Sequence, residues 1–115
     1  MKRDWDCIKA ILKTLAESED NAPKLACGQL LPTWDEDTVM FHFRLLEEAG
    51  LIEGHPPGRP FMATRITWRG YDLLDIQSND GFWARIKHTA QAKGVAITLD
   101  SIGWLAKHVA SQVLG

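Results

Sequence analysis

The sequence predicts a mainly α-helical fold that carries one small β-hairpin. Apolar residues recur at helical spacing in several segments of the chain. Residues 38–49 end at Gly50 and pass directly into a short apolar strand, and residues 65–74 form a pattern typical of a strand that leads into a helix. With 115 residues, the chain is most simply one domain that buries its own core.

The N-terminal elements come first. A helix is predicted over residues 3–17, and its apolar side is made by Trp5, Ile8, Ile11, Leu12 and Leu15. Residues 24–31 fit either one helical turn or a short strand, and Pro32 ends them in both cases. Cys7 and Cys27 are too far apart for a metal knuckle or a redox pair, so we expect buried or half-buried free thiols.

The central helix has two chemically different faces. Thr33 and Glu36 match a capping box, which predicts a helix that ends near Ala49 with Gly50 as its left-handed cap. The core face carries Val39, Phe43 and Leu46, flanked by His42 and Ala49. The opposite, outward face carries Asp37, Met40, Phe41, Arg44 and Glu48.

The hairpin follows, with predicted strands at residues 51–54 and 61–66 and a proline-rich tip at residues 55–60. Thr67 is the expected N-cap of the next helix, which should reach residue 76.

Two C-terminal helices complete the prediction. A turn at residues 78–81 should lead into a helix over residues 82–92 that stops at Gly94. Thr98 should cap the last helix, whose apolar stripe is Ile102, Leu105, Ala106, Val109 and Val113. The five tryptophans show no stacking ladder, and we expect most of them in the core or at helix junctions.

Composition narrows the class of protein. No apolar run approaches the length of a membrane-spanning helix and the N-terminus does not look like a signal peptide, so we expect a cytoplasmic protein without a membrane partner. The net charge is −2, with six Lys/Arg and eleven Asp/Glu in residues 1–57 against seven and four in residues 58–115. Residues 54–71 contain no acid and carry His55, Arg59, Arg65 and Arg69, so the hairpin is basic, and the helical half before it is acidic.

Several motifs together resemble those of one family. They are Met1-Lys2-Arg3-Asp4-x-Asp6-x-Ile8, His42-Phe43-x-Leu45-Leu46-x-x-Ala49-Gly50-Leu51-Ile52, Arg65-Ile66-Thr67-Trp68-x-Gly70-x-Asp72-Leu73-Leu74-Asp75, and Phe82-Trp83-x-x-Ile86-Lys87 followed by Leu99-Asp100. The chain is similar to domain-of-unknown-function family 2513 over nearly its whole length. The central helix and hairpin also resemble the recognition helix and wing of bacterial winged-helix repressors.

These resemblances imply a winged-helix-like domain in which residues 1–77 form the core and residues 78–115 a C-terminal helical extension. They also imply carriage on phages, prophages or other mobile elements. They imply no particular activity, because a fold alone does not confer one.

The outward face of the central helix is the first candidate site. A DNA-reading helix usually begins with donors, whereas this one begins with Asp35, Glu36 and Asp37. We therefore predict that Asp37, Met40, Phe41, Arg44 and Glu48 recognise a host or phage protein, and so modulate a host complex. The alternative is that the carboxylates only cap the helix and that Phe41 packs under residues 24–31.

The basic hairpin is the second candidate site. His55, Arg59, Arg65 and Arg69 would contact DNA if the protein were a small transcriptional regulator. The alternative is an ordinary solvated hairpin whose prolines stiffen the loop.

For other functions the sequence offers little. The four histidines and two cysteines lack metal-ligand spacing, and no nucleophile, phosphate loop or acid/base pair stands out, so we predict no metal, no cofactor and no enzyme. The C-terminal helix is apolar on more than one side because Trp104 lies off its stripe. It would either form a homodimer or pack within the chain.

Overall fold

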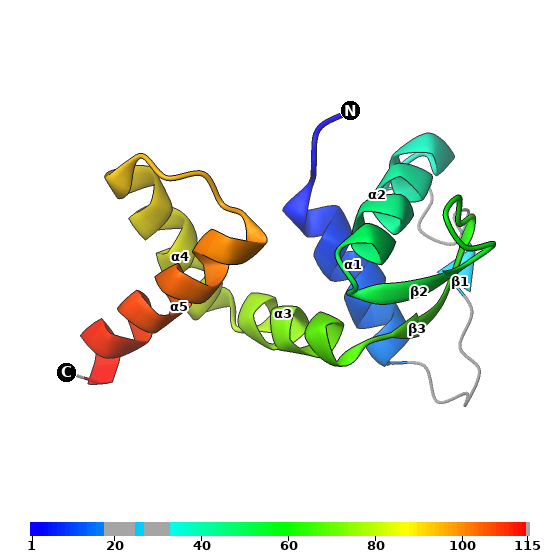
Figure 1. The fold of residues 1–115 in the computed structure, drawn as a ribbon. Coiled ribbons are helices and arrows are strands. Elements are labelled where there is room, and N and C mark those ends of the chain that lie inside the picture. The colour runs from blue at the N-terminus through cyan, green and yellow to red at the C-terminus, as the bar shows by residue number, and fades with distance from the viewer. Residues whose placement is uncertain (18–24, 27–32, 115) are drawn as a thin grey trace. The chain divides into compact units, whose positions relative to one another are not determined.

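The computed structural model describes residues 1–17, 25–26 and 33–114. Within them the chain is mainly helical with a three-stranded antiparallel sheet (Figure 1). The chain divides into two compact units, Met1–Leu74 and Asp75–Gly115. None of the described helices is both long enough and apolar enough to span a bilayer.

Helix α1 (Trp5–Ala16) starts at Asp4, whose carboxylate accepts hydrogen bonds from the N–H groups of Asp6 and Cys7 at 2.9 and 3.2 Å. Its predicted apolar side is confirmed except that Trp5 is only half-buried. Cys7 is fully buried, and desolvation, together with the nearby Asp4 charge, raises the pKa of its thiol to about 12. Cys27 lies outside the described residues.

Helix α2 (Glu36–Glu48) begins two residues later than a capping box at Thr33 requires, so that prediction is wrong. The N-cap is Asp35, whose carboxylate accepts the N–H of Thr38 at 2.7 Å. Because Glu36 is itself the first helical residue, it is not at the third position from which a side chain reaches back to the cap.

The end of α2 is as predicted. Gly50 has φ of +74°, its N–H donates to the Glu47 carbonyl at 3.0 Å, and the N–H of Leu51 donates to the Leu46 carbonyl at 2.9 Å. These two bonds are the Schellman pattern, which needs a residue that tolerates the left-handed conformation. They turn the chain directly from α2 into the sheet.

The sheet contains β1 (Leu25–Ala26), β2 (Ile52–His55) and β3 (Met62–Ile66), in the order β1-β3-β2. The predicted hairpin thus gains a third strand. Of the two alternatives for residues 24–31, the strand holds for Leu25 and Ala26, and the rest of that segment lies outside the described residues. The buried side chains of Leu25, Ala63 and Ile66 face the core that α1 and α2 also line.

Helix α3 (Trp68–Ser78) is tied to the end of α2 through its predicted cap. The hydroxyl of Thr67 accepts the N–H of Gly70 at 3.2 Å and donates to the Gly50 carbonyl at 2.6 Å. The helix extends two residues beyond its predicted end.

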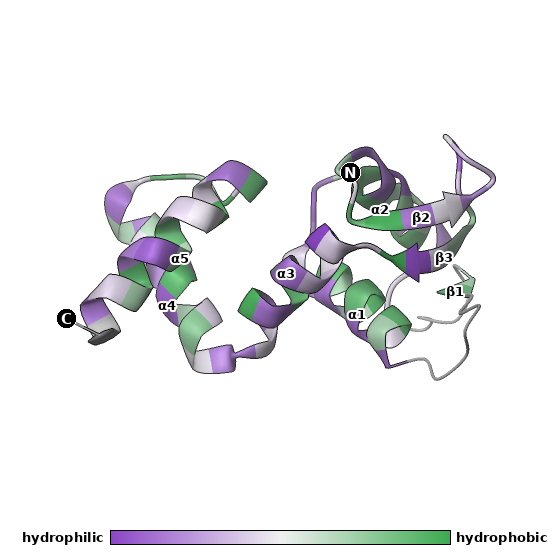
Figure 2. Cartoon of the chain, turned by 60° about the horizontal axis from the view of Figure 1, so that its bottom comes forward, coloured by the Kyte–Doolittle hydropathy of each residue, from purple (hydrophilic) through white to green (hydrophobic). Residues whose placement is uncertain are grey.

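The second unit contains α4 (Asp80–Lys93) and α5 (Leu99–Leu114). The predicted turn at residues 78–81 shrinks to Asn79 because this residue caps α4 directly, accepting the N–H of Phe82 at 3.0 Å. Gly94, with φ of +67°, ends α4 as predicted, and Thr98 caps α5 in a reciprocal pair with Ser101. The two helices show both hydrophobic and hydrophilic positions (Figure 2), and their buried residues are Trp83, Ile86, Ala90, Ile102, Leu105 and Val109. Of the other two residues in the predicted α5 stripe, Ala106 is half-buried and the side chain of Val113 lies outside the described part of the chain.

Candidate partner-binding site

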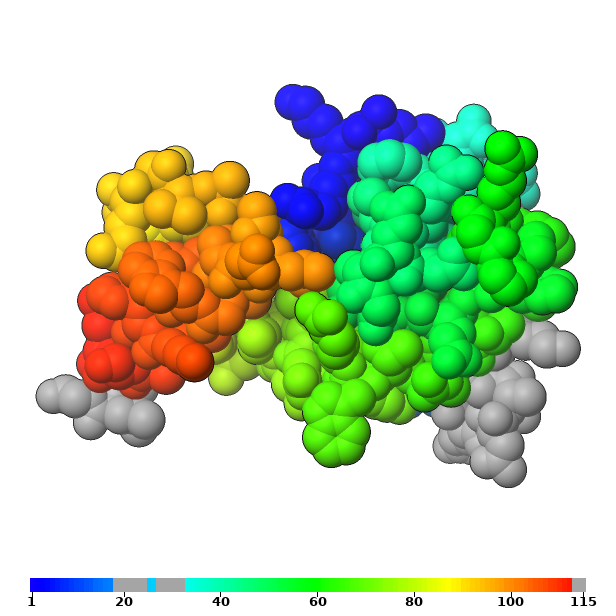
Figure 3. Space-filling model, viewed as in Figure 1, coloured from blue at the N-terminus to red at the C-terminus, as the bar shows by residue number. Residues whose placement is uncertain are grey.

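A hollow of about 380 Å³ combines residues from both predicted sites. Four of the five outward residues of α2 line it, and they are joined by Arg59 from the hairpin tip (residues 56–61). Figure 3 shows α2 and the hairpin side by side on the surface of the first unit, Met1–Leu74. We call this site the arginine hollow, and its lining residues are Met1, Asp37, Met40, Phe41, Arg44 and Arg59. Glu48, the fifth predicted residue, is exposed on α2 outside this lining.

The apolar part of the arginine hollow comes from α2. The side chain of Met40 is 38% exposed, which is high for a large apolar residue. Phe41 is half-buried rather than fully exposed, because its ring packs edge-on against the buried His42 with the ring centroids 5.3 Å apart. The alternative in which residues 24–31 cover Phe41 falls largely on residues outside the described parts of the chain.

The charged part comes from two elements. Arg44 is exposed on α2 and Arg59 is exposed at the hairpin tip, and both reach the same hollow. Among the described residues, neither guanidinium is in an ion pair, in contrast to Arg65. Asp37 contributes the one carboxylate of the lining. The arginine hollow therefore presents two available cationic groups beside the apolar side chains of Met40 and Phe41.

The hairpin tip is held near α2 by a hydrogen bond. A carboxylate oxygen of Glu47 accepts the N–H of Gly58 at 2.9 Å. Within the tip, the N–H of Arg59 donates to the Pro56 carbonyl at 3.3 Å, and Gly58 has φ of +88°. Glu47 thus positions the turn from which Arg59 projects.

The four basic residues of the hairpin hypothesis have different surroundings. Arg65 lies 2.8 Å from Glu53 on the neighbouring strand, and this pair lowers the pKa of the Glu53 carboxyl and raises that of Arg65. His55 packs edge-on against Phe61 with 6.2 Å between ring centroids, away from the arginine hollow. Arg69 lies on α3. Arg59 alone joins the residues of α2.

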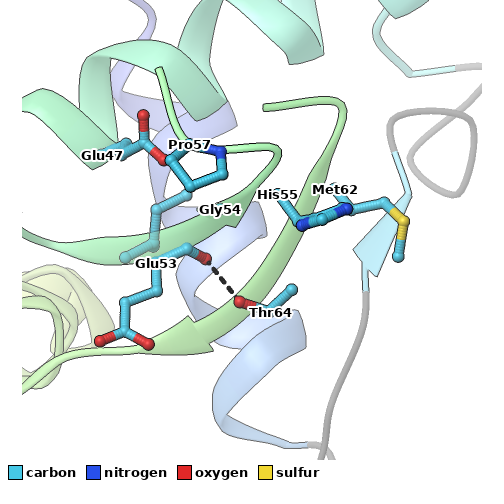
Figure 4. A pocket seen from close by; sticks show the side chains of 8 residues that line it. Glu47, Glu53, Gly54, His55, Pro57, Met62 and Thr64 are labelled. Carbon is cyan, nitrogen blue, oxygen red and sulfur yellow. Dashed lines mark hydrogen bonds between the residues drawn. The ribbon is translucent and has the colours of Figure 1, made fainter. Parts of the chain in front are cut away.

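A larger cavity of about 650 Å³ lies along the hairpin (Figure 4). Two hydrogen bonds of its lining residues hold the hairpin itself: the Thr64 hydroxyl donates to the Glu53 carbonyl at 3.1 Å, and Glu47 accepts the N–H of Gly58. With Glu53 paired to Arg65, this cavity has fewer available charged groups than the arginine hollow. Within the described residues, no group of three His, Cys, Asp or Glu side chains could hold a metal ion.

Two of the five tryptophans are exposed, Trp68 and Trp104. Trp5, Trp34 and Trp83 are buried or half-buried, as expected for most of the tryptophans. Trp68 is 83% exposed at the start of α3, and Trp104 is 51% exposed on α5, where it stacks on His108 at 5.8 Å. The position of Trp104 off the apolar stripe indicated its exposure in advance. Trp68 had no comparable signal, because it is the first residue of its helix.

The chain is similar to one protein family and to one bacterial relative. The family model described as "Hypothetical protein (DUF2513)" matches residues 2–96. A relative from Haemophilus influenzae, described as "Uncharacterized protein", is 39% identical over 122 residues, which cover 99% of this chain and 99% of the relative. No solved structure matches the chain.

Proposed function

The chain belongs to the DUF2513 family of hypothetical proteins, and from that premise we propose that it is a non-enzymatic binding module that recognises a protein partner. The observation that carries the proposal is the arginine hollow, where apolar and charged side chains meet on an exposed surface. Interfaces between proteins are enriched in Met, aromatic residues and Arg, and the hollow contains all three.

The charge at the start of α2 supports a protein partner over nucleic acid. Asp35, Glu36 and Asp37 are all exposed there, and the hydrogen bond from the Thr38 N–H keeps the pKa of Asp35 low. Three carboxylates close to a phosphate chain would oppose binding, and the effect would grow at low salt.

The proposed setting is a winged-helix-like domain of a phage or other mobile element, acting in the cytoplasm on a host complex. The order of elements supports the fold part of this proposal: helix α1, strand β1, helix α2 and then the β2–β3 hairpin, which would be the wing. In this setting α2 would take the place of a recognition helix, but its first turn presents Asp35, Glu36 and Asp37 instead of base-reading donors.

The test is capture of a partner from a host lysate by the full chain and by variants of matched exposure. Met40→Ala should abolish capture, and Arg44→Glu should do the same, with unchanged helical content by circular dichroism. Val95→Ala is the control, because Val95 is also 38% exposed but lies in the second unit. If Met40→Ala captures as well as the control does, α2 is not the binding surface. Phe41→Ala alone would be ambiguous, because Phe41 is half-buried and its removal can disturb packing as well as binding.

A DNA-binding regulator is the second candidate, and Arg59 is the observation that favours it. This residue is exposed at the tip of the hairpin, where a wing would contact a phosphate chain. A fluorescence-anisotropy titration with a mixed-sequence duplex at about 50 and 200 mM salt separates the two candidates. Micromolar affinity that falls steeply with salt and is lost in Arg59→Ala would favour the regulator, and no binding at low salt would exclude it.

A homodimer through the C-terminal helices remains part of the proposal. Exposure of Trp104 on α5, off the buried stripe, supports it. Sedimentation velocity of the intact chain and of Trp104→Ala tests it, since a dimer should shift toward monomer in the variant.

A further inference from the structure

The residues that line the arginine hollow indicate which kind of protein segment binds there. We infer that it holds one acidic side chain of the partner, next to an apolar residue of the same segment. This inference rests on the proposed function, because it identifies which kind of segment the proposed site takes.

The first argument is the pair of guanidinium groups. Arg44 and Arg59 come from different elements, and neither is neutralised by an ion pair among the described residues. A guanidinium binds a carboxylate through two parallel hydrogen bonds, and its rigid geometry suits this planar anion. Both groups line one hollow of about 380 Å³, and we expect a carboxylate bound there to contact both.

The second argument is the charge balance of the lining. Its side chains carry two positive charges, from Arg44 and Arg59, and one negative charge, from Asp37. A single carboxylate would balance these three side-chain charges. A polyanion would add further negative charge next to Asp35, Glu36 and Asp37, which repel it.

The third argument is the apolar part of the lining. Met40 and Phe41 line the same hollow as the two arginines, so an apolar residue beside the bound carboxylate would bury against them. Methionine adapts its shape to such a neighbour, and the exclusion of water strengthens the adjacent charged hydrogen bonds. The segment predicted from these contacts is therefore an acidic residue flanked by an apolar one.

The test uses the intact, ¹⁵N-labelled protein and a blocked peptide, acetyl-Leu-Glu-Leu-Leu-amide. We expect saturable shifts of the side-chain Nε–Hε signals of Arg44 and Arg59. The peptide with Gln in place of Glu should bind about tenfold more weakly, because a charged hydrogen bond is lost. A third peptide, with Gln and a free C-terminal carboxylate, tests whether the hollow prefers the carboxylate of a side chain or that of a chain end.

Three variants make the result specific. Arg44→Gln and Arg59→Gln should each weaken binding of the Glu peptide about tenfold. Arg69→Gln removes the same charge from exposed α3 and should leave the affinity unchanged. Backbone amide spectra of the variants report whether each one is folded.

Four results would overturn the inference. The first two are equal binding of the Glu and Gln peptides, and tightest binding of the peptide with the free C-terminus. The third is stronger binding of inorganic phosphate or duplex DNA than of the Glu peptide. The fourth is that Arg69→Gln weakens binding of the Glu peptide as much as Arg44→Gln and Arg59→Gln do. The proposed function has its own separate outcome. If the peptide fails while Met40→Ala still abolishes capture, the acidic-segment inference is wrong and the proposed function stands.

Discussion

The backbone N–H of Asp4 donates to Nε2 of His42 at 2.8 Å, which joins the start of α1 to the middle of α2. The other ring nitrogen, Nδ1, lies 2.8 Å from the carbonyl oxygen of Thr38. Because Nε2 accepts, the proton resides on Nδ1 and is donated to Thr38. Both nitrogens of this fully buried ring are therefore satisfied. His42 therefore packs beside the core face of α2, as predicted, and its two hydrogen bonds connect α2 to the start of α1.

Replacing His42 by Leu should lower the free energy of unfolding by about 1–3 kcal/mol, because the N–H of Asp4 loses its acceptor in a partly buried place. Urea denaturation followed by circular dichroism measures this change. His88→Leu, at an exposed position on α4, is the control and should change it by less than about 0.5 kcal/mol. Equal effects of the two substitutions would show that the bond between Asp4 and His42 contributes nothing.

The Asp4 carboxylate predicts a loss of stability in acid. Burial alone would raise its pKa, but hydrogen bonds from Trp34 Nε1 at 3.1 Å and from the N–H groups of Cys7 and Asp6 hold it below its usual value. A carboxyl whose pKa is lower in the folded state stabilises the fold above the unfolded-state pKa. This contribution is lost as the pH falls from that value through the lower, folded-state pKa.

We therefore expect the urea midpoint to fall below about pH 4, with a shallower fall in Asp4→Asn. Asp72→Asn removes an exposed carboxylate from α3 and controls for the change in net charge. If Asp4→Asn and the unmodified protein lose stability with the same slope between pH 5 and pH 3, Asp4 is not the group responsible.

Gly70 allows α3 to start directly against the chain after α2. A Cβ at this position would overlap the carbonyl oxygen of Leu51 and would lie 2.6 Å from Cγ1 of Ile66. Gly70→Ala should destabilise the protein by about 1–3 kcal/mol, since the backbone at Leu51 must move. Thermal unfolding measures the effect.

Gly103 provides the matched control for Gly70. It is exposed within α5, and no atom lies within 4 Å of the position that a Cβ would take. Gly103→Ala should therefore stabilise the protein by up to about 1 kcal/mol through helix propensity. A gain at both positions would contradict the close approach of Gly70 to Leu51.

Glu47 is expected to act through the position of the hairpin tip. In Glu47→Ala the N–H of Gly58 loses its acceptor, so its amide proton signal should move upfield and the tip should loosen. Glu48→Ala removes the neighbouring, exposed carboxylate and should leave the Gly58 signal in place. The same signal in both variants would place Gly58 outside the reach of Glu47 in solution.

Local features were predictable from the sequence, because they depend on residues within a few positions of each other. The buried sides of α1 and α5, the glycine ends at Gly50 and Gly94, and the caps at Thr67 and Thr98 belong to this group. The two wrong predictions were also local: Asp35 rather than Thr33 caps α2, and Asn79 alone forms the turn before α4. In each case the side chain closest to the first helical turn made the capping bond.

By itself, then, the sequence determined the helices and the two strands of the hairpin, and which face of α2 points outward, since periodicity records the side on which the core lies. Only the tertiary structure decided which distant residues meet. The third strand at Leu25, the bond between Asp4 and His42, and the meeting of Arg59 with Arg44 all depend on how far the chain turns between elements. Spacing along the sequence does not encode that turn, because small changes in loop dihedrals move the following element by many ångströms. The two predicted sites were therefore separate in the sequence, and folding joined part of each into one hollow.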